Sequence, residues 1–334
     1  MSAKYGTITT YGERLISEAE TLVALGSRSK TLVRDYRQRL EGHCKPFFGS
    51  QSVRSINTPR LKEFVAYLAA KGLKATSIHA ILSFVSMTLK VAVDDGVLKA
   101  VPRMPRPSAK DNPRPWFSRQ EYKQLLQTLR RLERASTPVV VRRWPITKEL
   151  RSFCTFMVNS FLRPADVFAL KHSNCEIVQR PDGIRYVKIT LPSSKAANYP
   201  VITMPAAVEI YRRLKADHEK DGYGKSSDYV FLPQYQSRSY AQEIIRRQFG
   251  YVLGEADLKT TGAGAERTTY SLRHTAIMFR LINNEGLDLL TLARNCRTSV
   301  EMIDRFYAKH LDAEMNVAKL QSMKFPSRYG KSLS

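Results

Sequence analysis

Apolar residues recur at helical spacing through the first hundred residues of the chain. After the Thr58-Pro59 pair, for example, Leu61, Phe64 and Leu68 fall on one side of a helix. The helices predicted in this way cover residues 15–23, 33–47, 58–72 and 76–96. Their other sides are polar, so residues 1–101 are predicted to form a small helical domain.

Residues 102–115 interrupt this pattern. The segment contains five prolines and no apolar periodicity, and proline neither donates a backbone hydrogen bond nor continues a helix. We interpret it as a linker between two domains. Beyond it, Ser118 and Glu121 have the spacing of a capping box, which predicts the start of a helix. Another helix is predicted over residues 147–160.

The pattern changes to short β-type segments between residues 175 and 204. Three runs rich in Val, Ile and Tyr are separated by a Pro181-Asp182-Gly183 turn and by a polar loop at 193–198. They predict a three-stranded antiparallel sheet, after which helical spacing returns. The expected fold class is therefore mainly α with a small antiparallel β-sheet, with a second domain over 116–326 and a short tail over 327–334.

The composition of the 334-residue chain is typical of a folded protein that stays in water. Hydrophobic residues make up 43% of it, which is enough for a core and argues against intrinsic disorder. No uninterrupted apolar run approaches the roughly 18 residues of a membrane span. The first residues lack the apolar region of a secretory signal. We therefore expect a cytoplasmic protein.

The sequence predicts no metal ion and no cofactor. Its four cysteines are far apart and form no CxxC pair, which argues against a disulfide scaffold and a zinc ribbon and suits the reducing cytosol. A P-loop-like Gly224-Lys225-Ser226 and an HExxH-like His218-Glu219 lack the residues that would complete either motif. No cluster of carboxylates suggests a two-metal nuclease.

The charge balance points to a polyanionic partner. Lys and Arg number 54 against 30 Asp and Glu, a formal net charge of +24, and such a surplus attracts phosphates of any sequence. Residues 1–110 hold 18 Lys and Arg against 8 acids, and the remainder holds 36 against 22. These charges could merely be solvated, but two basic domains could also hold a duplex from two sides, so we expect DNA. The residues predicted to contact it from the first domain and the linker are Arg28, Lys30, Arg34, Arg37, Lys74 and Arg106.

Metal-free cleavage of a phosphodiester needs a nucleophile, cations for the non-bridging oxygens, and an acid for the leaving oxygen. Arg163 directly precedes a helix that begins with proline, where helix amides also favour an anion. Asp166, one turn further on, could hold its guanidinium. Arg273 lies at the start of a second apolar helix, and Tyr307 is the candidate nucleophile.

These positions resemble the signature of the tyrosine recombinases, or phage integrases. Leu162-Arg163-Pro164-Ala165-Asp166 is similar to the family's first arginine box, and Leu272-Arg273-His274-Thr275 is similar to its second. Lys195, in the loop between two predicted strands, and Tyr307, downstream of the second box, match the family's lysine and nucleophile. The ordered set covers most of the chain.

The resemblance implies a helical core-binding domain at the N-terminal side, an α+β catalytic domain after the linker, and a reaction without metal or ATP. Tyr307 would attack a DNA phosphate to form a 3′-phosphotyrosyl link. Arg163 and Arg273 would stabilise the charge on the phosphoryl oxygens, and Lys195 would protonate the departing 5′ oxygen. The 5′ hydroxyl of a partner strand would then rejoin the DNA.

The resemblance also implies the partners. These are double-stranded DNA with a specific recombination site and further copies of the chain in a synaptic tetramer on two sites. Accessory DNA-bending proteins or a second recombinase are further candidates. A nucleoid-associated location in the cytoplasm follows. Helical spacing over residues 311–323 predicts a segment that packs on its own domain or docks on a neighbouring protomer.

Two positions depart from the family's usual pattern. Tyr270 stands three residues before the second arginine, where the family usually has His and sometimes Lys or Tyr. Thr298 stands nine residues before the nucleophile, where the family usually has His or Trp. A phenol with the ordinary pKa of about 10 can donate a hydrogen bond but is a poor base. His274, directly after the second arginine, could take over the proton transfer or could be a hydrogen-bonded structural histidine.

Each assignment has a structural alternative. Tyr307 shares a helical face with Ile303 and could be a core residue, Lys195 could be a solvated loop lysine, and Thr298 with Glu301 could cap a helix. At the level of function, the alternatives are a type IB topoisomerase, which relaxes supercoils without pairing two sites, and a DNA-binding regulator that kept the fold and lost catalysis.

Overall fold

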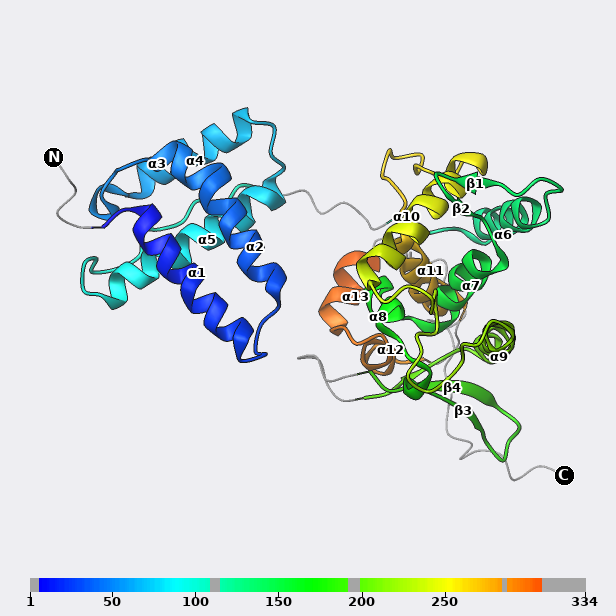
Figure 1. Cartoon of the computed structure of the whole chain (residues 1–334). Helices are drawn as coiled ribbons and strands as arrows, with labels where there is room; N and C mark the ends of the chain where they lie inside the picture. Colours follow the sequence, from blue (N-terminus) through cyan, green and yellow to red (C-terminus); the bar gives the residue numbers. More distant parts are fainter. Residues whose placement is uncertain (1–5, 109–114, 192–198, 284–286, 308–334) are drawn as a thin grey trace, which may run out of the picture. The chain divides into compact units, whose positions relative to one another are not determined.

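The computed structural model describes residues 6–108, 115–191, 199–283 and 287–307. The chain divides into two compact units, unit 1 at residues 1–111 and unit 2 at residues 112–334, so the boundary falls within the segment interpreted as a linker (Figure 1). Three sequence-based expectations lie outside the described residues. They concern Lys195, the helical segment at 311–323, and the tail at 327–334.

Unit 1 is a bundle of helices around one apolar core (Figure 1). Helix α1 packs along α5, and α2 packs on both of them. The elements of unit 1 are α1 (Ile8–Ala24), α2 (Lys30–Arg39), the π-helical turn η1 (Leu40–Cys44), α3 (Lys45–Phe48), the 3-10 turn η2 (Val53–Ser55), α4 (Thr58–Ala70) and α5 (Ala75–Asp94). The helical domain predicted from apolar spacing is thus present.

The ends of these helices depend on polar caps that apolar spacing does not indicate. Helix α1 begins seven residues earlier than expected because the Thr7 hydroxyl accepts a hydrogen bond from the amide of Thr10 at 3.2 Å. Asn57, not Thr58, caps α4, so Pro59 occupies the second helical position rather than the first. The long helix predicted near residues 33–47 is divided by the wider turn η1.

Helix α5 is the central helix of unit 1. Phe84, Val85 and Leu89 have no exposed surface. By length and composition alone, α5 is the one helix among the described residues that could cross a membrane, and half of that apolar stretch is buried inside the protein. Its hydropathy is therefore explained by the core that it fills.

The first part of the segment interpreted as a linker lies against unit 1. The Thr58 hydroxyl donates to the carbonyl of Arg103 at 3.1 Å, and the Nε2 atom of His79 lies 2.6 Å from the carbonyl oxygen of Pro107. Met104 packs on the core. Residues 102–108 have no helix or strand, as their prolines predict, but these contacts attach them to unit 1.

Unit 2 combines helices with two small antiparallel sheets (Figure 1). Its helices are α6 (Arg119–Glu133), α7 (Lys148–Ser160), α8 (Pro164–Ala169), the 3-10 turn η3 (His172–Asn174), α9 (Ala206–Lys220), α10 (Arg238–Glu255), α11 (Thr269–Asn283), α12 (Leu289–Asn295) and α13 (Val300–Tyr307). Its strands are β1 (Val140–Val141), β2 (Trp144–Pro145), β3 (Cys175–Gln179), β4 (Arg185–Ile189) and β5 (Val201–Ile202). The fold class is mainly α with small antiparallel sheets, as predicted.

Helix α7 lies at the centre of unit 2 and contacts α6, α9 and α11. Its residues Phe153, Phe156 and Met157 are fully buried, and Thr147 caps its first turn, where the predicted helix begins. Helix α6 starts with the capping box predicted at Ser118 and Glu121. Both predictions are confirmed.

The three-stranded sheet has the order β3-β4-β5. Strand β4 pairs antiparallel with both neighbours, with Val187 opposite Ile177 and Lys188 opposite Ile202. This confirms the predicted sheet, and α9 covers β4. The hairpin β1–β2 was not predicted, because strands of two residues are too short to show an alternating pattern.

Candidate active site

Arg163 stands at the start of α8, directly before Pro164, where the sequence placed it. Its Nη2 atom donates to the carbonyl of Arg297 at 2.7 Å. Asp166 lies one turn further on, 3.7 Å from Nη1, and so holds the guanidinium from the helix side. The side chain is 36% exposed, so the guanidinium can reach solvent and a ligand.

Arg273 lies on α11 and is only 4% exposed. Its Nη1 atom donates to the carbonyl of Phe161, and its Nη2 atom donates to the carbonyl of Cys296 at 2.6 Å. Phe161 ends α7 in the left-handed conformation, with φ of 60°. Through these bonds Arg273 joins the end of α7 to the turn between α12 and α13.

The two arginines therefore bind consecutive carbonyls of one turn, those of Cys296 and Arg297. Burial raises the pKa of the Cys296 thiol to about 12, while Arg273 and Arg163 act in the opposite direction. Both guanidiniums thus lie within electrostatic range of one buried group. A guanidinium carries five N–H donors, so these bonds leave donors on both arginines for an anion.

Tyr307 is the last residue of α13 and is 5% exposed. Its ring packs in a cluster with Ile303 and Cys296. The hydroxyl lies 2.5 Å from the Nδ1 atom of His274, which is 6% exposed. The same cluster contains Phe161, and Arg273 binds the carbonyls of Phe161 and Cys296, so Tyr307 belongs to the same neighbourhood as the buried guanidinium. The burial of Tyr307 also agrees with the alternative interpretation, in which this tyrosine is a core residue.

Tyr270 and Thr298 occupy different places around this neighbourhood. Tyr270 is 38% exposed, and its ring centroid lies 5.0 Å from that of His274. Thr298 lies in the turn after α12, where its amide donates to the carbonyl of Ala293 at 3.0 Å. The cap predicted at Thr298 is wrong by one residue, because Ser299 accepts the hydrogen bond from the Met302 amide that opens α13. Thr298 is therefore not engaged as that cap.

Several residues that organise this neighbourhood were missed by the sequence analysis. Phe161, Cys296 and Arg297 act through backbone carbonyls, which leave no signal in side-chain chemistry. The positive φ of Arg297, 52°, was also unpredicted, because no glycine marks that position.

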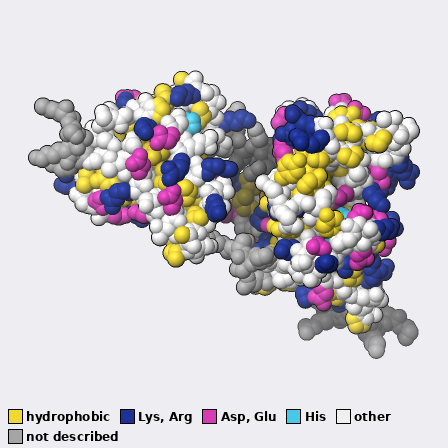
Figure 2. Space-filling model, in the orientation of Figure 1, with side chains coloured by type: hydrophobic (Ala, Val, Ile, Leu, Met, Phe, Trp, Pro, Cys, Tyr) yellow, Lys and Arg dark blue, Asp and Glu magenta, His cyan; other side chains and the backbone are white. Residues whose placement is uncertain are grey.

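The six residues predicted to contact DNA are all exposed on unit 1. Figure 2 shows that basic side chains on the visible face are interspersed with acidic ones. Arg34 is paired with Asp35 at 3.1 Å, and Arg37 is paired with Glu20 at 2.6 Å. The carboxylates neutralise part of the charge of these two arginines. Both should therefore attract DNA phosphates less strongly than the sequence alone indicates.

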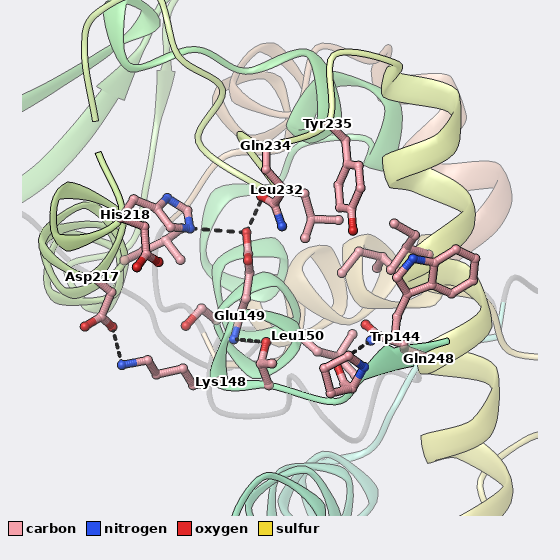
Figure 3. Close-up of a pocket in the computed structure, with 17 residues that line it drawn as sticks. Trp144, Lys148, Glu149, Leu150, Asp217, His218, Leu232, Gln234, Tyr235 and Gln248 are labelled. Carbon is pink, nitrogen blue, oxygen red and sulfur yellow. Dashed lines mark hydrogen bonds and ion pairs between the residues drawn. The ribbon is translucent and has the colours of Figure 1, made fainter. Parts of the chain in front are cut away.

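A cavity of about 340 Å³ lies elsewhere in unit 2, between the start of α7, α9 and α10 (Figure 3). Its walls include Trp144, Tyr235 and Gln248, and none of the predicted site residues line it. On one wall Glu149 accepts a hydrogen bond from the amide of Leu232 at 2.5 Å and lies 3.4 Å from His218 (Figure 3). Within the described part of the chain, no three His, Cys, Asp or Glu side chains gather as a metal ion would require.

No protein-family model matches the chain, and no curated protein matches it significantly. Solved structures do. The Tn1549 transposon integrase in complex with a circular intermediate DNA is 13% identical, with a TM-score of 0.65, over 95% of this chain and 99% of that one. A lambda integrase tetramer bound to a Holliday junction is 15% identical, with a TM-score of 0.61, over 91% and 79%. Both are tyrosine recombinases. This chain therefore has the tyrosine-recombinase fold.

Proposed function

We propose that the protein is a site-specific DNA recombinase that cuts and rejoins strands through a 3′-phosphotyrosyl intermediate. The observation that carries the proposal is the binding of Arg163 and Arg273 to consecutive carbonyls of the turn that leads into the helix ending at Tyr307. Two permanent cations and a phenol from three distant parts of the chain are the groups that metal-free strand transfer requires. The fold shared with DNA-bound integrases supports the same function.

In the proposed reaction, the Tyr307 oxygen bonds to phosphorus while the bond from phosphorus to the 5′ oxygen breaks. Ionising a free tyrosine at pH 7 costs about 4 kcal/mol. Arg163 and Arg273 offset part of this cost, because they stabilise the negative charge on the phosphoryl oxygens in a largely buried setting. The phosphotyrosine conserves the energy of the ester, so rejoining needs no ATP, and the two guanidiniums take the place of a metal ion in this proposal.

The remaining predicted groups have supporting roles in this proposal. Lys195 would protonate the departing 5′ oxygen, for which an ammonium with three N–H donors is suited. Tyr270 and Thr298 would donate hydrogen bonds to the phosphate. Asp166 would keep the Arg163 guanidinium in place, as the 3.7 Å between its carboxylate and Nη1 supports.

Double-stranded DNA with a specific site is the proposed substrate. The net charge of +24 and the exposed basic residues of unit 1 support this choice. We further propose that four copies assemble on two sites in the cytoplasm, at the nucleoid. Strand exchange requires two cut duplexes in one complex. A single protomer could therefore not complete the reaction.

The test uses the full chain and a library of nicked duplexes of randomised sequence. When a nick lies a few nucleotides beyond the cleavage position, cleavage releases a short fragment that carries the 5′ hydroxyl. This fragment diffuses away, so the strand cannot be rejoined and the protein stays covalently attached to the DNA. We expect a covalent adduct that survives denaturation, with Tyr307 attached to a 3′ phosphate, and sequencing of the trapped DNA would give the site. The Tyr307→Phe variant should bind DNA equally well and form no adduct.

Two other outcomes favour the alternatives. DNA binding by the wild-type chain without any adduct would favour a regulator that has the fold without the chemistry. An adduct together with relaxation of a supercoiled plasmid, and no joining of two selected sites, would favour a topoisomerase. Arg163→Lys and Arg273→Lys should each reduce adduct formation about 10²- to 10³-fold, because the planar fork that spans two acceptors is lost.

A further inference from the structure

The buried imidazole of His274 faces the hydroxyl of Tyr307. The Nδ1 atom lies 2.5 Å from the phenolic oxygen, and the two ring centroids are 5.5 Å apart. Both side chains are at least nine-tenths buried, at 6% and 5% exposure. A general base must lie within hydrogen-bonding reach of the proton that it removes. This pair meets that condition.

Among the residues that the structure describes, the other groups around this pair are poorer acceptors. Arg273 and Arg163 cannot give up or accept a proton near neutral pH. Tyr270 is a phenol like the nucleophile itself, so it offers no driving force for removing a phenolic proton. Its ring packs against the ring of His274, at a centroid distance of 5.0 Å. Tyr270 thus packs on one side of the imidazole and Tyr307 meets its edge nitrogen.

We propose that His274 is the proton acceptor for Tyr307, an inference that rests on the function proposed above. In the required tautomer Nε2 carries the hydrogen and Nδ1 presents its lone pair to the phenol. As the bond from the Tyr307 oxygen to phosphorus forms, the phenolic proton moves to Nδ1 and the bond from phosphorus to the 5′ oxygen breaks. The departing 5′ oxygen takes its proton from a separate donor. On rejoining, the proton returns from Nδ1 to the phenolic oxygen.

The roles of acceptor and positioning group can be separated by substitution. In His274→Asn, the amide oxygen can occupy the place of Nδ1 and accept the hydrogen bond, but it cannot take up the proton. Single-turnover adduct formation on the trapped nicked duplex should fall about 10²- to 10⁴-fold, the usual contribution of a general base. A residue that only positions Tyr307 would retain nearly the full rate in this variant.

The chain offers a matched control pair. His172 contacts Tyr211 in the same way, with Nδ1 2.9 Å from the hydroxyl, and is also 6% exposed. His172→Asn therefore also removes a buried imidazole that contacts a tyrosine hydroxyl, but it should not change the rate of adduct formation. Thermal unfolding of both variants checks that each is folded at the assay temperature.

A substrate with sulfur in place of the bridging 5′ oxygen identifies the proton concerned. A thiolate leaves without being protonated, so a defect in the acid is relieved on this substrate, whereas a defect in removing the phenolic proton persists. We expect the His274→Asn deficit to remain. If it disappears, His274 acts on the leaving group and the inference is wrong.

The possible failures are distinguishable. If the wild-type chain forms no adduct, the proposed function itself is overturned. If wild type forms the Tyr307 adduct while His274→Asn stays within threefold of its rate, or if His172→Asn loses as much, the function stands and the role of His274 as proton acceptor is overturned.

Discussion

Asn295 pairs with the backbone of Ile202 in both directions. The side-chain oxygen accepts from the Ile202 amide at 2.8 Å, and the side-chain nitrogen donates to the Ile202 carbonyl at 3.0 Å. Strand β5 is the last strand of its sheet, and one amide side chain here takes the place of a further strand. Asn295 also ends α12, directly before the turn that both arginines bind, so it connects the sheet to the candidate active site.

Removing this connection should destabilise the fold modestly. We expect Asn295→Ala to lower the free energy of unfolding by about 1–2 kcal/mol, since two partly exposed hydrogen bonds are lost. Urea denaturation of the full chain measures this. The control is Gln242→Ala, which removes an exposed amide from α10. Equal midpoints for the two variants would contradict the structural role assigned to Asn295.

Phe161 combines an unfavourable backbone with a favourable side chain. Its φ of 60° costs a non-glycine residue about 1–2 kcal/mol, but its ring is 4% exposed and packs with Ile277 and Tyr307. Phe161→Gly relieves the backbone strain but removes the buried ring, whose packing is worth about 3–5 kcal/mol. We therefore expect a net loss of stability of about 1–4 kcal/mol. An increase in the unfolding midpoint would show that the backbone strain outweighs the packing.

The candidate site residues could be predicted from the sequence better than the backbone that positions them. Arg163, Arg273 and Tyr307 stand out because motifs of charged and nucleophilic residues keep their order and spacing, and the structure brings them into one neighbourhood. The carbonyls that the two arginines bind carry no such signal, because every residue has one. Caps were misplaced by one residue at Asn57 and Ser299 because a polar neighbour of similar capping ability follows or precedes each.

Burial of His172 predicts a pH-dependent loss of stability. Desolvation lowers its pKa from 6.5 to about 4, with Lys215 and His218 acting in the same direction. Below pH 6.5 the unfolded chain takes up a proton that the folded chain does not, so stability falls between pH 6.5 and about 4 and then levels off. The expected loss from this group is about 3 kcal/mol. Subtracting the unfolding free energies of His172→Asn from those of wild type, measured across this range, isolates it. A flat difference would refute the prediction.

Contacts from unit 1 to DNA should be visible in the salt dependence of binding. Lys30 is exposed, and no carboxylate pairs with it among the residues that the structure describes. If it neutralises a phosphate, Lys30→Gln should reduce the slope of log K against log salt by about 1. Lys62→Gln makes the same charge change on α4, outside the predicted set, and should leave the slope unchanged. Fluorescence anisotropy with one labelled duplex measures both slopes. Equal slopes for the two variants would remove Lys30 from the contact set.

Glu149 should be a determinant of stability in unit 2, away from the candidate active site. Its carboxylate lies in the first turn of α7, accepts from the amide of Leu232, and approaches His218 on α9 (Figure 3). Leu232 has a φ of 50°, so this bond helps to hold an unfavourable backbone conformation.

Glu149→Ala leaves the Leu232 amide without this acceptor, and we expect a loss of about 2–3 kcal/mol in the free energy of unfolding. Glu149→Gln retains an acceptor oxygen and should lose less. The matched surface change is Glu176→Ala, which removes an exposed carboxylate paired with Lys188 at 3.2 Å and should cost under about 1 kcal/mol. Because the cavity wall does not contain the arginines or Tyr307, adduct formation by folded Glu149→Gln should match that of wild type. A selective loss of adduct in this variant, with unchanged stability, would show that the cavity communicates with the reacting groups.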